Sequence, residues 1–349
     1  MILNARESAE ERELKNLAPC AAKSREARRV RPEEPCPFRT AFQRDRDRII
    51  HSKAFRRLAY KTQVFSHPAG DHYRTRLTHT LEVSQIARTL ANALGLNEDL
   101  TEAVALGHDL GHTPFGHTGE RVLARLHPQG FTHQAQSLRV VDFLEKDGAG
   151  LNLTVEVRDG ILKHSKGRGP IFAASGDGPA TLEGQIVRIS DIIAYLAHDL
   201  GDAFRAGLLA PDDVPPGLRQ TFGARGSTRI AAMVGDLLAN SQRSENGGLA
   251  LAFSPALEKS MIDLREFLHG QVYQHPRLAE GLAAGDRLIE DLYNLFLNDQ
   301  KLFREFFPAT QPSGGGSPET AVCDFIAGMT DRYAQALHQR LFPVENRPG

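Results

Sequence analysis

Cysteine is scarce in this chain of 349 residues, and no apolar run approaches the length needed to cross a membrane. The three cysteines, Cys20, Cys36 and Cys323, are odd in number and lack the spacing of a metal-binding motif. This argues against a disulfide framework and is typical of a reducing compartment. Because the amino terminus also lacks a signal-peptide core, we expect a soluble, cytoplasmic protein with no membrane partner.

A strong net charge is missing as well. The formal net charge is −1, so neither a nucleic-acid-coating surface nor an acidic tail dominates. The charge is uneven, however, because residues 1–61 hold 16 Lys and Arg against 9 Asp and Glu. Such a basic stretch is most simply a solvated surface, and the alternative is contact with a phosphate-bearing partner.

Signals for a sheet are the third absence, since no alternating apolar pattern is long enough for one. With 41% hydrophobic residues, the chain can still bury a large core in one or two domains. Apolar residues recur at helical spacing and no internal repeat is present, so the sequence predicts an all-α fold. We expect a charged arm, formed by a loosely attached helix and strap, over residues 1–36. Late helices are predicted at 228–240, 256–269, 285–306 and 319–341, with a flexible connector at 309–318.

Histidines and acids are concentrated between residues 74 and 120. Apolar residues four, seven and eleven positions after His79 share its helical face, so His79 should point inward. Gly95 should end this helix, and a second helix should lead to His108 and Asp109. An antiparallel return would bring His79 against this pair. Two imidazoles and a carboxylate in one buried place suit a divalent metal ion, although a lone inward histidine is usually an ordinary core residue.

A long helix predicted from Thr181 carries a second, polar stripe. Asp191, Tyr195 and Asp199 recur on it at one-turn spacing. A carboxylate beside a row of isoleucines cannot stay buried and charged without a partner. We therefore predict Asp191 as the fourth protein ligand, after the two histidines and Asp109. The alternative is a hydrated polar face, but Tyr195 between the two acids favours a lined pocket.

The predicted ligand set and its surroundings indicate the chemistry available. Two neutral imidazoles and two carboxylates admit Mg, Mn, Co, Ni, Fe or Zn. His117 and Glu120 are neighbours on a first helical turn, so the carboxylate can orient the imidazole for proton transfer. Cations and apolar residues interleave at 55–61, where Arg57 and Lys61 either belong to an ordinary amphipathic helix or face a polyphosphate.

These motifs together resemble the HD-domain phosphohydrolases and, more narrowly, the deoxyguanosinetriphosphate triphosphohydrolase-like proteins. The centre of the likeness is HDLGHTPFGHTGE at 108–120, within an H…HD…D pattern. Further matching segments follow the family's order over about residues 35–341: FRRLAYKTQVF at 55–65, FTHQAQSLRVV at 131–141, GILKHS at 160–165, LEGQIVRISDIIAYLAHDL at 182–200 and DFIAGMTDRYA at 324–334. The resemblance implies an HD-domain helical bundle with additional C-terminal helices, divided into an arm at 1–36, an HD core at 37–205 and a C-terminal region at 206–349 that packs on the core.

The resemblance also implies roles for single residues. The pair His117 and Glu120 matches the family's catalytic dyad, and we group His112 with it. Positions that face the phosphates in the family are matched here by His112, His133 and Arg76, and positions around the deoxyribose are matched by Tyr195 and Asp199. An aromatic ring below the sugar disfavours a 2′-hydroxyl.

One position departs from the family. Some relatives carry a lysine directly after the metal-binding aspartate, where this chain has Ile192. A cation for the phosphates must then come from elsewhere, with Lys61 and Arg332 as candidates. The resemblance also favours placing Arg57 and Lys61 at the site rather than on an ordinary helix.

The activity implied by the resemblance is that of a metal-dependent deoxynucleoside triphosphate triphosphohydrolase, which converts a dNTP and water into a deoxynucleoside and tripolyphosphate. One alternative is another HD-domain nucleotide phosphohydrolase, such as a monophosphatase or a cyclic phosphodiesterase. A second is a nucleotide-sensing or nucleic-acid-binding protein without turnover. The family further implies a homo-oligomer, with a hexamer as one form, and a dNTP or nucleic acid as a candidate regulator.

Overall fold

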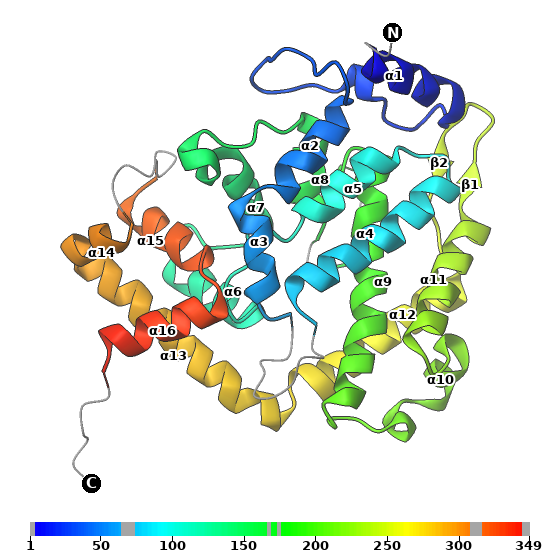
Figure 1. Ribbon diagram of the computed structural model, residues 1–349. Coiled ribbons are helices and arrows are strands. Elements are labelled where there is room, and N and C mark those ends of the chain that lie inside the picture. Colours follow the sequence, from blue (N-terminus) through cyan, green and yellow to red (C-terminus); the bar gives the residue numbers. More distant parts are fainter. Residues whose placement is uncertain (1–3, 64–73, 166–168, 173–175, 308–315, 344–349) are drawn as a thin grey trace. The chain divides into compact units, whose positions relative to one another are not determined.

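Helices dominate the computed structural model of the chain (Figure 1). The structure describes residues 4–63, 74–165, 169–172, 176–307 and 316–343. Within these ranges the named strands are β1 (Gln242–Arg243) and β2 (Leu249–Ala250), an antiparallel pair in which Gln242 lies opposite Ala250. The all-α prediction is confirmed. None of the helices in the described ranges is both long and apolar enough to span a bilayer.

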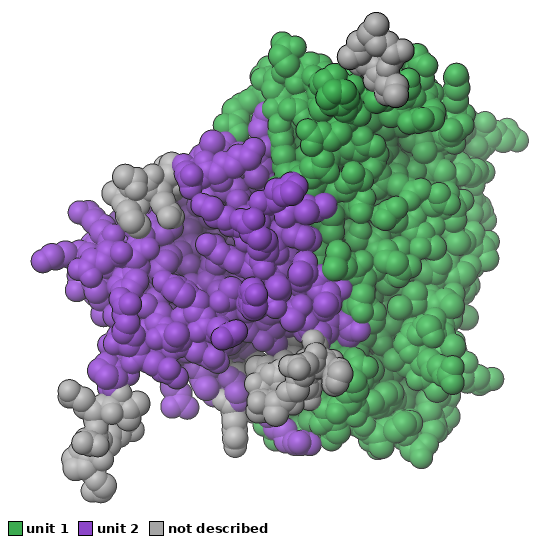
Figure 2. All heavy atoms as spheres, viewed as in Figure 1, with its two compact units in different colours: residues 1–48, 79–108, 153–276 green, residues 49–78, 109–152, 277–349 purple. Residues whose placement is uncertain are grey.

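The chain divides into two compact units, each assembled from separate stretches of sequence (Figure 2). Unit 1 comprises residues 1–48, 79–108 and 153–276, and unit 2 comprises residues 49–78, 109–152 and 277–349. The three-part division into 1–36, 37–205 and 206–349 stays a prediction.

Unit 1 is organised around one long helix, α9 (Leu182–Arg205). Its other helices are α1 (Ala5–Asn16), α2 (Ala41–Ile50), α4 (Arg76–Ala93), α5 (Glu98–Gly107), α8 (Val155–Lys163), α10 (Pro216–Phe222), α11 (Gly226–Asn240) and α12 (Pro255–Leu268), with short 3₁₀ turns at Ser24–Glu26 and Pro211–Asp213 and a π turn at His269–Tyr273. Helix α9 packs against α5, α8, α11 and α12, and its isoleucine stripe is buried.

Three predicted helix boundaries in unit 1 are confirmed by backbone conformation or side-chain caps. Gly95, with φ +63°, follows the end of α4, a left-handed conformation that glycine adopts without strain. The Asn97 side chain then caps α5 by accepting a bond from the Leu100 amide. Thr181 caps α9 in the same way, accepting from the Gly184 amide.

The N-terminal strap is held more firmly than the sequence predicts. The Glu183 carboxylate, which is fully buried on α9, accepts bonds of 3.0 Å from the amides of Ala22 and Asn97. Asn97 in turn donates to the Ala22 carbonyl at 3.1 Å. The prediction of a loosely attached arm is therefore wrong at the strap, because one buried carboxylate fastens it to the start of α5.

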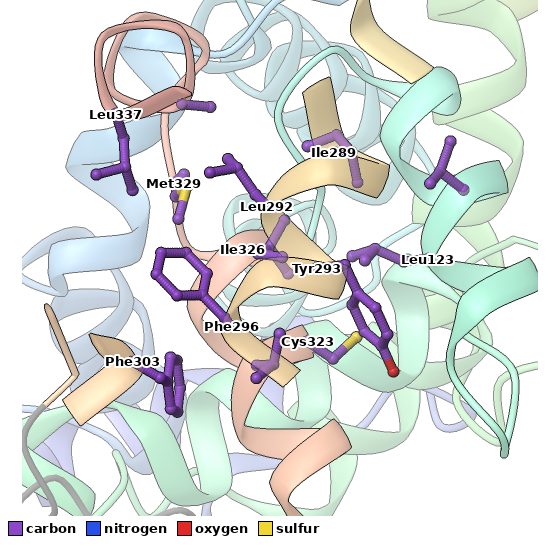
Figure 3. Packing of buried hydrophobic residues seen from close by; sticks show 14 of the residues in the cluster. Leu123, Ile289, Leu292, Tyr293, Phe296, Phe303, Cys323, Ile326, Met329 and Leu337 are labelled. Atoms are coloured by element: carbon purple, nitrogen blue, oxygen red, sulfur yellow. The ribbon is translucent and has the colours of Figure 1, made fainter. Parts of the chain in front are cut away.

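Unit 2 surrounds an apolar core rich in phenylalanine. Its helices are α3 (Lys53–Arg57), α6 (His117–Leu126), α7 (His133–Arg139), α13 (Pro276–Asn298), α14 (Gln300–Phe306), α15 (Pro318–Ala327) and α16 (Asp331–Leu341), with 3₁₀ turns at Leu58–Tyr60 and Lys146–Gly148 and a π turn at Val140–Leu144. Figure 3 shows Leu292 and Phe296 of α13 pointing toward Ile326 of α15, and all three are fully buried. This cluster holds the C-terminal helices against α6.

Two long helices predicted near the C terminus are each broken in the structure. The Asp299 side chain accepts from the Leu302 amide and so starts α14 as a new helix. Thr330 caps α16 by accepting from the Tyr333 amide, which separates α15 from α16. The predictions of continuous helices at 285–306 and 319–341 are therefore wrong at these caps. Most of the predicted connector at 309–318 lies outside the described residues.

Candidate active site

In unit 1, an imidazole and a carboxylate from different helices meet. His79 is 2% exposed on the inner face of α4, as predicted. Its Nε2 lies 3.1 Å from Oδ1 of Asp191 on α9. Burial raises the pKa of Asp191, but the hydrogen bond with His79 and the neighbouring imidazoles outweigh this and lower the pKa to about 2. The carboxylate therefore stays charged and available to a cation.

Two further imidazoles stand at the ends of α5 and α8. Nδ1 of His108 lies 2.6 Å from the Ala105 carbonyl oxygen, and Nδ1 of His164 lies 2.8 Å from that of Ile161. Because a carbonyl can only accept, each Nδ1 carries the hydrogen and Nε2 is left as the ligand atom. The donor atoms of His108, His164 and Asp191 all lie within 4.8 Å of one another.

These donors fit a divalent metal ion. Buried imidazoles and a charged carboxylate gathered this closely are stabilised when they share a cation, and oriented Nδ1–H groups are usual for metal-bound histidine. Three predicted ligands, His79, His108 and Asp191, therefore come together in unit 1. The fourth, Asp109, follows His108 directly in the chain and is counted with unit 2. His164 lies in the segment GILKHS and is not among the ligands that the sequence predicts.

Farther along α9 lie Tyr195 and Asp199, the residues predicted to contact the sugar. Asp199 is hydrogen-bonded by Tyr273, which the sequence did not predict as part of the site. The Tyr273 hydroxyl donates to Oδ2 of the buried Asp199. Burial raises the pKa of Tyr273 well above its ordinary value, and the Asp199 charge adds to this, so the hydroxyl remains a donor. Burial likewise raises the pKa of Tyr195 beyond its ordinary range, against the nearby Arg265 cation. No sequence pattern links Asp199 to a tyrosine 74 positions away.

In unit 2, a buried arginine has hydrogen-bonding capacity to spare. Arg76 is 2% exposed, and its Nη1 donates to Oδ2 of Asp109 at 2.8 Å. Its Nε and Nη2 have no hydrogen-bond partner among the described residues. A Cβ on Gly116 would lie 3.3 Å from Nη2, so a side chain there would crowd the guanidinium. Because a buried donor without a partner costs about 1–3 kcal/mol, the arrangement indicates a place for an anionic ligand.

Three imidazoles and one carboxylate gather in the same unit. The rings of His112 and His133 stack with centroids 3.9 Å apart, and His117 lies edge-on to His112 at 5.8 Å. One oxygen of Glu120 lies 2.9 Å from Nδ1 of His133 and accepts its backbone amide at 2.8 Å. The other oxygen lies 3.4 Å from Nδ1 of His117. Glu120 thus pairs with its helical neighbour, as predicted, and also with a histidine from α7.

The charges of this histidine group follow from its surroundings. Burial raises the pKa of Glu120, but the hydrogen bonds with His117 and His133 outweigh it and lower the pKa well below its usual range. Burial lowers the pKa of His112 well below its ordinary value, and the Arg76 cation adds to this. Glu120 is therefore an anion and His112 a neutral ring. Nδ1 of His112 has no hydrogen-bond partner within the described part of the chain.

The turn that leads into α6 is held from the C-terminal part of unit 2. Phe115 and Gly116 both have positive φ, at +59° and +57°, and the phenylalanine is strained there. Oδ1 of Asp331 accepts from the Phe115 amide at 3.0 Å, and Oδ2 accepts from the Thr62 amide at 3.0 Å. Asp331 therefore fixes the backbone immediately before His117, a role that the sequence did not indicate.

Two of the remaining predicted cations, Lys61 and Arg57, donate to backbone carbonyls. The Lys61 amino group is buried and donates to the carbonyls of His112 and Ala327. Burial, with the Arg57 cation adding to it, lowers the pKa of Lys61 to about 7. Arg57 donates to the Gly328 carbonyl at 3.1 Å, and Arg332 is exposed.

Arg57 and Lys61 line a cavity of about 500 Å³ within unit 2. The aromatic residues in its wall are Phe306, Phe307, Phe325 and Tyr333. Neither Arg76 nor any of the three clustered histidines is among the described residues that line it. The structure thus brings Arg76 and the histidines together, and places Arg57 and Lys61 in the lining of this cavity.

Comparison with known proteins yields two family matches, an HD domain over residues 76–196 and a phosphohydrolase-associated domain over residues 251–340. A deoxyguanosinetriphosphate triphosphohydrolase-like protein of Desulfatibacillum aliphaticivorans is 51% identical over 348 residues, covering 97% of this chain and 98% of that protein. A protein of the same description from Caldanaerobacter subterraneus subsp. tengcongensis is 53% identical over 342 residues, covering 97% of this chain and 96% of that protein. Another, from Clostridium perfringens strain 13, is 44% identical over 315 residues, covering 90% of each chain. The HD match includes all four predicted metal ligands.

Proposed function

This chain belongs to the HD-domain family of deoxyguanosinetriphosphate triphosphohydrolase-like proteins, and on that premise we propose that it hydrolyses deoxynucleoside triphosphates to deoxynucleoside and tripolyphosphate in a metal-dependent reaction. Family membership supports a phosphohydrolase. The residues of the two units support the narrower substrate class, as follows.

The proposed metal ligands are His79, His108, Asp109 and Asp191. For three of them the support is the buried cluster of unit 1, and for Asp109 it is the peptide bond to His108 and the family's HD pair. A divalent ion held there polarises a phosphate oxygen and stabilises the charge that develops at phosphorus. Nitrogen and oxygen donors in this proportion suit Mn, Fe, Co, Ni or Zn, and also admit Mg.

The observation that carries the proposal is the buried Arg76, two of whose nitrogens have no hydrogen-bond partner within the described ranges. A planar guanidinium offers two parallel N–H groups, which match the oxygens of a phosphate. Asp109 fixes its orientation through Nη1, and the neutral His112 adds a ring nitrogen beside it without adding charge. These groups are suited to hold an anionic polyphosphate.

Proton transfer in the proposed reaction falls to Glu120 and its two histidines. Because the carboxylate stays ionised, it orients both rings and stabilises either one when it is protonated. His117 is 77% exposed and can exchange protons with solvent, whereas His133 is 9% exposed and is held more closely. The group can therefore deliver a proton to the leaving sugar oxygen and recover one from water.

A sugar-binding role is proposed for the stripe on α9. Asp199, held by Tyr273, can accept a hydrogen bond from a 3′-hydroxyl, and the Tyr195 ring can pack beneath the deoxyribose. The cation that Ile192 does not supply can come from Arg188, one turn before Asp191. Arg188 is 4% exposed, bonds the carbonyls of Pro170 and Ile171, and has an Nη1 without a partner among the described residues.

A substrate screen tests the proposal. The purified chain is incubated with the four deoxy- and four ribonucleoside triphosphates, with nucleoside monophosphates and with cyclic nucleotides, each with Mg, Mn, Co, Ni, Fe or Zn. Turnover confined to deoxynucleoside triphosphates, and lost in Arg76→Gln, is the expected result. Turnover of monophosphates or cyclic nucleotides alone would favour the other HD-domain activities, and binding without turnover would favour a sensor. Assembly into a homo-oligomer, and regulation by a dNTP or nucleic acid, stay proposals carried by the resemblance.

A further inference from the structure

His164 lies beside His108 and Asp191, two of the proposed metal ligands. It follows the last residue of α8 and is 1% exposed. Its helix packs closely on α5, because a Cβ on Gly160 would lie 2.7 Å from both methyl groups of Val104. This close approach brings the C-terminal ends of the two helices together, and the rings of His108 and His164 meet with centroids 4.9 Å apart.

The orientation of His164 repeats that of His108. Each ring turns Nδ1 back to the carbonyl three residues earlier in its own helix, at 2.8 Å for His164 and 2.6 Å for His108. A backbone carbonyl that fixes Nδ1–H in this way is the usual support of a metal-binding imidazole. Two helix ends therefore present the same tautomer, each with Nε2 as the remaining donor.

The spacing of the donor atoms is also that of shared ligands. Two donors bound at about 2.1 Å to one ion lie about 3 Å apart at a right angle and about 4.2 Å apart when opposite. His79 and Asp191 are 3.1 Å apart, and the donors of His108, His164 and Asp191 lie within 4.8 Å of one another. Shifts of about half an ångström would bring the donors of His108, His164 and Asp191 onto one ion, and His79 meets the same carboxylate.

We propose that His164 binds the metal ion directly through Nε2, so that the centre presents three imidazoles together with its carboxylates. The inference rests on the proposed metal centre of His79, His108 and Asp191. A third imidazole makes the donor set softer than the HD pattern alone implies. Manganese, iron, cobalt, nickel or zinc should therefore be preferred to magnesium at equal concentration.

The number of imidazoles bound to the metal ion tests this inference independently of turnover. Metal-free full-length protein is loaded with one equivalent of Co²⁺, and X-ray absorption fine structure is recorded for the wild type and for His164→Asn. Asparagine can keep the hydrogen bond to Ile161 but cannot place a donor at the Nε2 position. His127→Asn, which changes a buried histidine bonded to Gln129 and Thr320, is the matched control.

We expect three imidazoles bound to Co²⁺ in the wild type and in His127→Asn, and two in His164→Asn. Affinity for Co²⁺ should fall more than about tenfold in His164→Asn, with native circular dichroism. Two imidazoles in the wild type would overturn the inference whether or not the variant folds, and so would failure of the wild type to bind Co²⁺. Hydrolysis of dNTPs is measured separately, so three imidazoles without turnover would reject the proposed function and leave the role of His164 intact.

Discussion

Glu120 is closer to His133 than to its own helical neighbour: its oxygens lie 2.9 Å from Nδ1 of His133 and 3.4 Å from Nδ1 of His117. If both rings take part in proton transfer, His117→Ala and His133→Ala should each lower kcat by about 10²–10⁴-fold with little change in KM. The double variant should lose much less than the product of the two, because the residues act as one unit. Steady-state kinetics with His127→Ala as control measures this, and a raised KM at unchanged kcat would make either histidine a binding residue.

Sugar discrimination depends on Tyr195 if its ring packs beneath the deoxyribose. Tyr195→Ala should narrow the ratio of kcat/KM for a deoxynucleotide over its matched ribonucleotide, because rejection by bulk requires the bulk to be present. Tyr195→Phe keeps the ring and should keep the ratio. An unchanged ratio in folded Tyr195→Ala would leave the residue with a packing role alone.

Tyr273 acts through Asp199 if the hydroxyl bond between them orients the carboxylate. Tyr273→Phe keeps the ring and removes only that donor, so kcat/KM for dNTPs should fall about tenfold, the effect of one hydrogen bond to a charged group. A 2′,3′-dideoxynucleotide has no 3′-hydroxyl to bind, so its turnover should hardly respond to the substitution. An equal loss for both substrates would mean that Tyr273 supports the fold rather than the 3′-hydroxyl contact.

Helix boundaries that depend on a residue's own backbone preference or side-chain cap can be predicted from the sequence. Gly95, Asn97 and Thr181 end or start helices through their own backbone preference or side-chain cap, and all three could be predicted. Asp299 and Thr330 also cap helices, yet acids and threonines are common on exposed helix faces, so the breaks could not be distinguished from a continuous pattern.

The residues of the candidate site also divide into those that local sequence predicts and those that tertiary packing determines. His79, His108 and Asp191 could be paired because helical periodicity turns each of them inward, and the structure brings them together. The contacts of Tyr273 and Asp331 could not be predicted, because their partners lie 74 and 216 or more positions away and are chosen by packing.

Asp331 should matter both for stability and for the turn before His117. Asp331→Ala leaves the amides of Thr62 and Phe115 without their acceptor, which should lower the free energy of unfolding by about 2–6 kcal/mol, at roughly 1–3 kcal/mol for each group. Because Phe115 is then free to leave its positive φ, kcat should fall more than metal affinity does. Urea unfolding measures the first effect, with the exposed Asp212→Ala as control. Wild-type stability in Asp331→Ala would contradict this account of the turn.

Glu183 should make stability depend on pH. Burial raises its pKa in the folded state, against the bonds from the Asn97 and Ala22 amides, while the unfolded chain ionises near the ordinary 4.5. A raised pKa contributes stability that is fully present below the unfolded value and is lost as pH rises through the folded value. Glu183→Gln does not titrate, so wild type should lose stability relative to this variant as the pH rises above 4.5. Urea unfolding of both proteins at a series of pH values measures it, and a constant difference would show that burial leaves the pKa unshifted.

The central claim is that water attacks the α-phosphorus of a dNTP, and the most direct test follows the oxygen of that water into the products. The chain is incubated with a dNTP in H₂¹⁸O, with the metal that supports turnover, and the products are separated and weighed by mass spectrometry. Attack of water at the α-phosphorus breaks the bond to the 5′ oxygen, so tripolyphosphate should carry one ¹⁸O, the deoxynucleoside none, and orthophosphate should be absent. Labelled orthophosphate or pyrophosphate, or ¹⁸O in the deoxynucleoside, would contradict the proposed reaction.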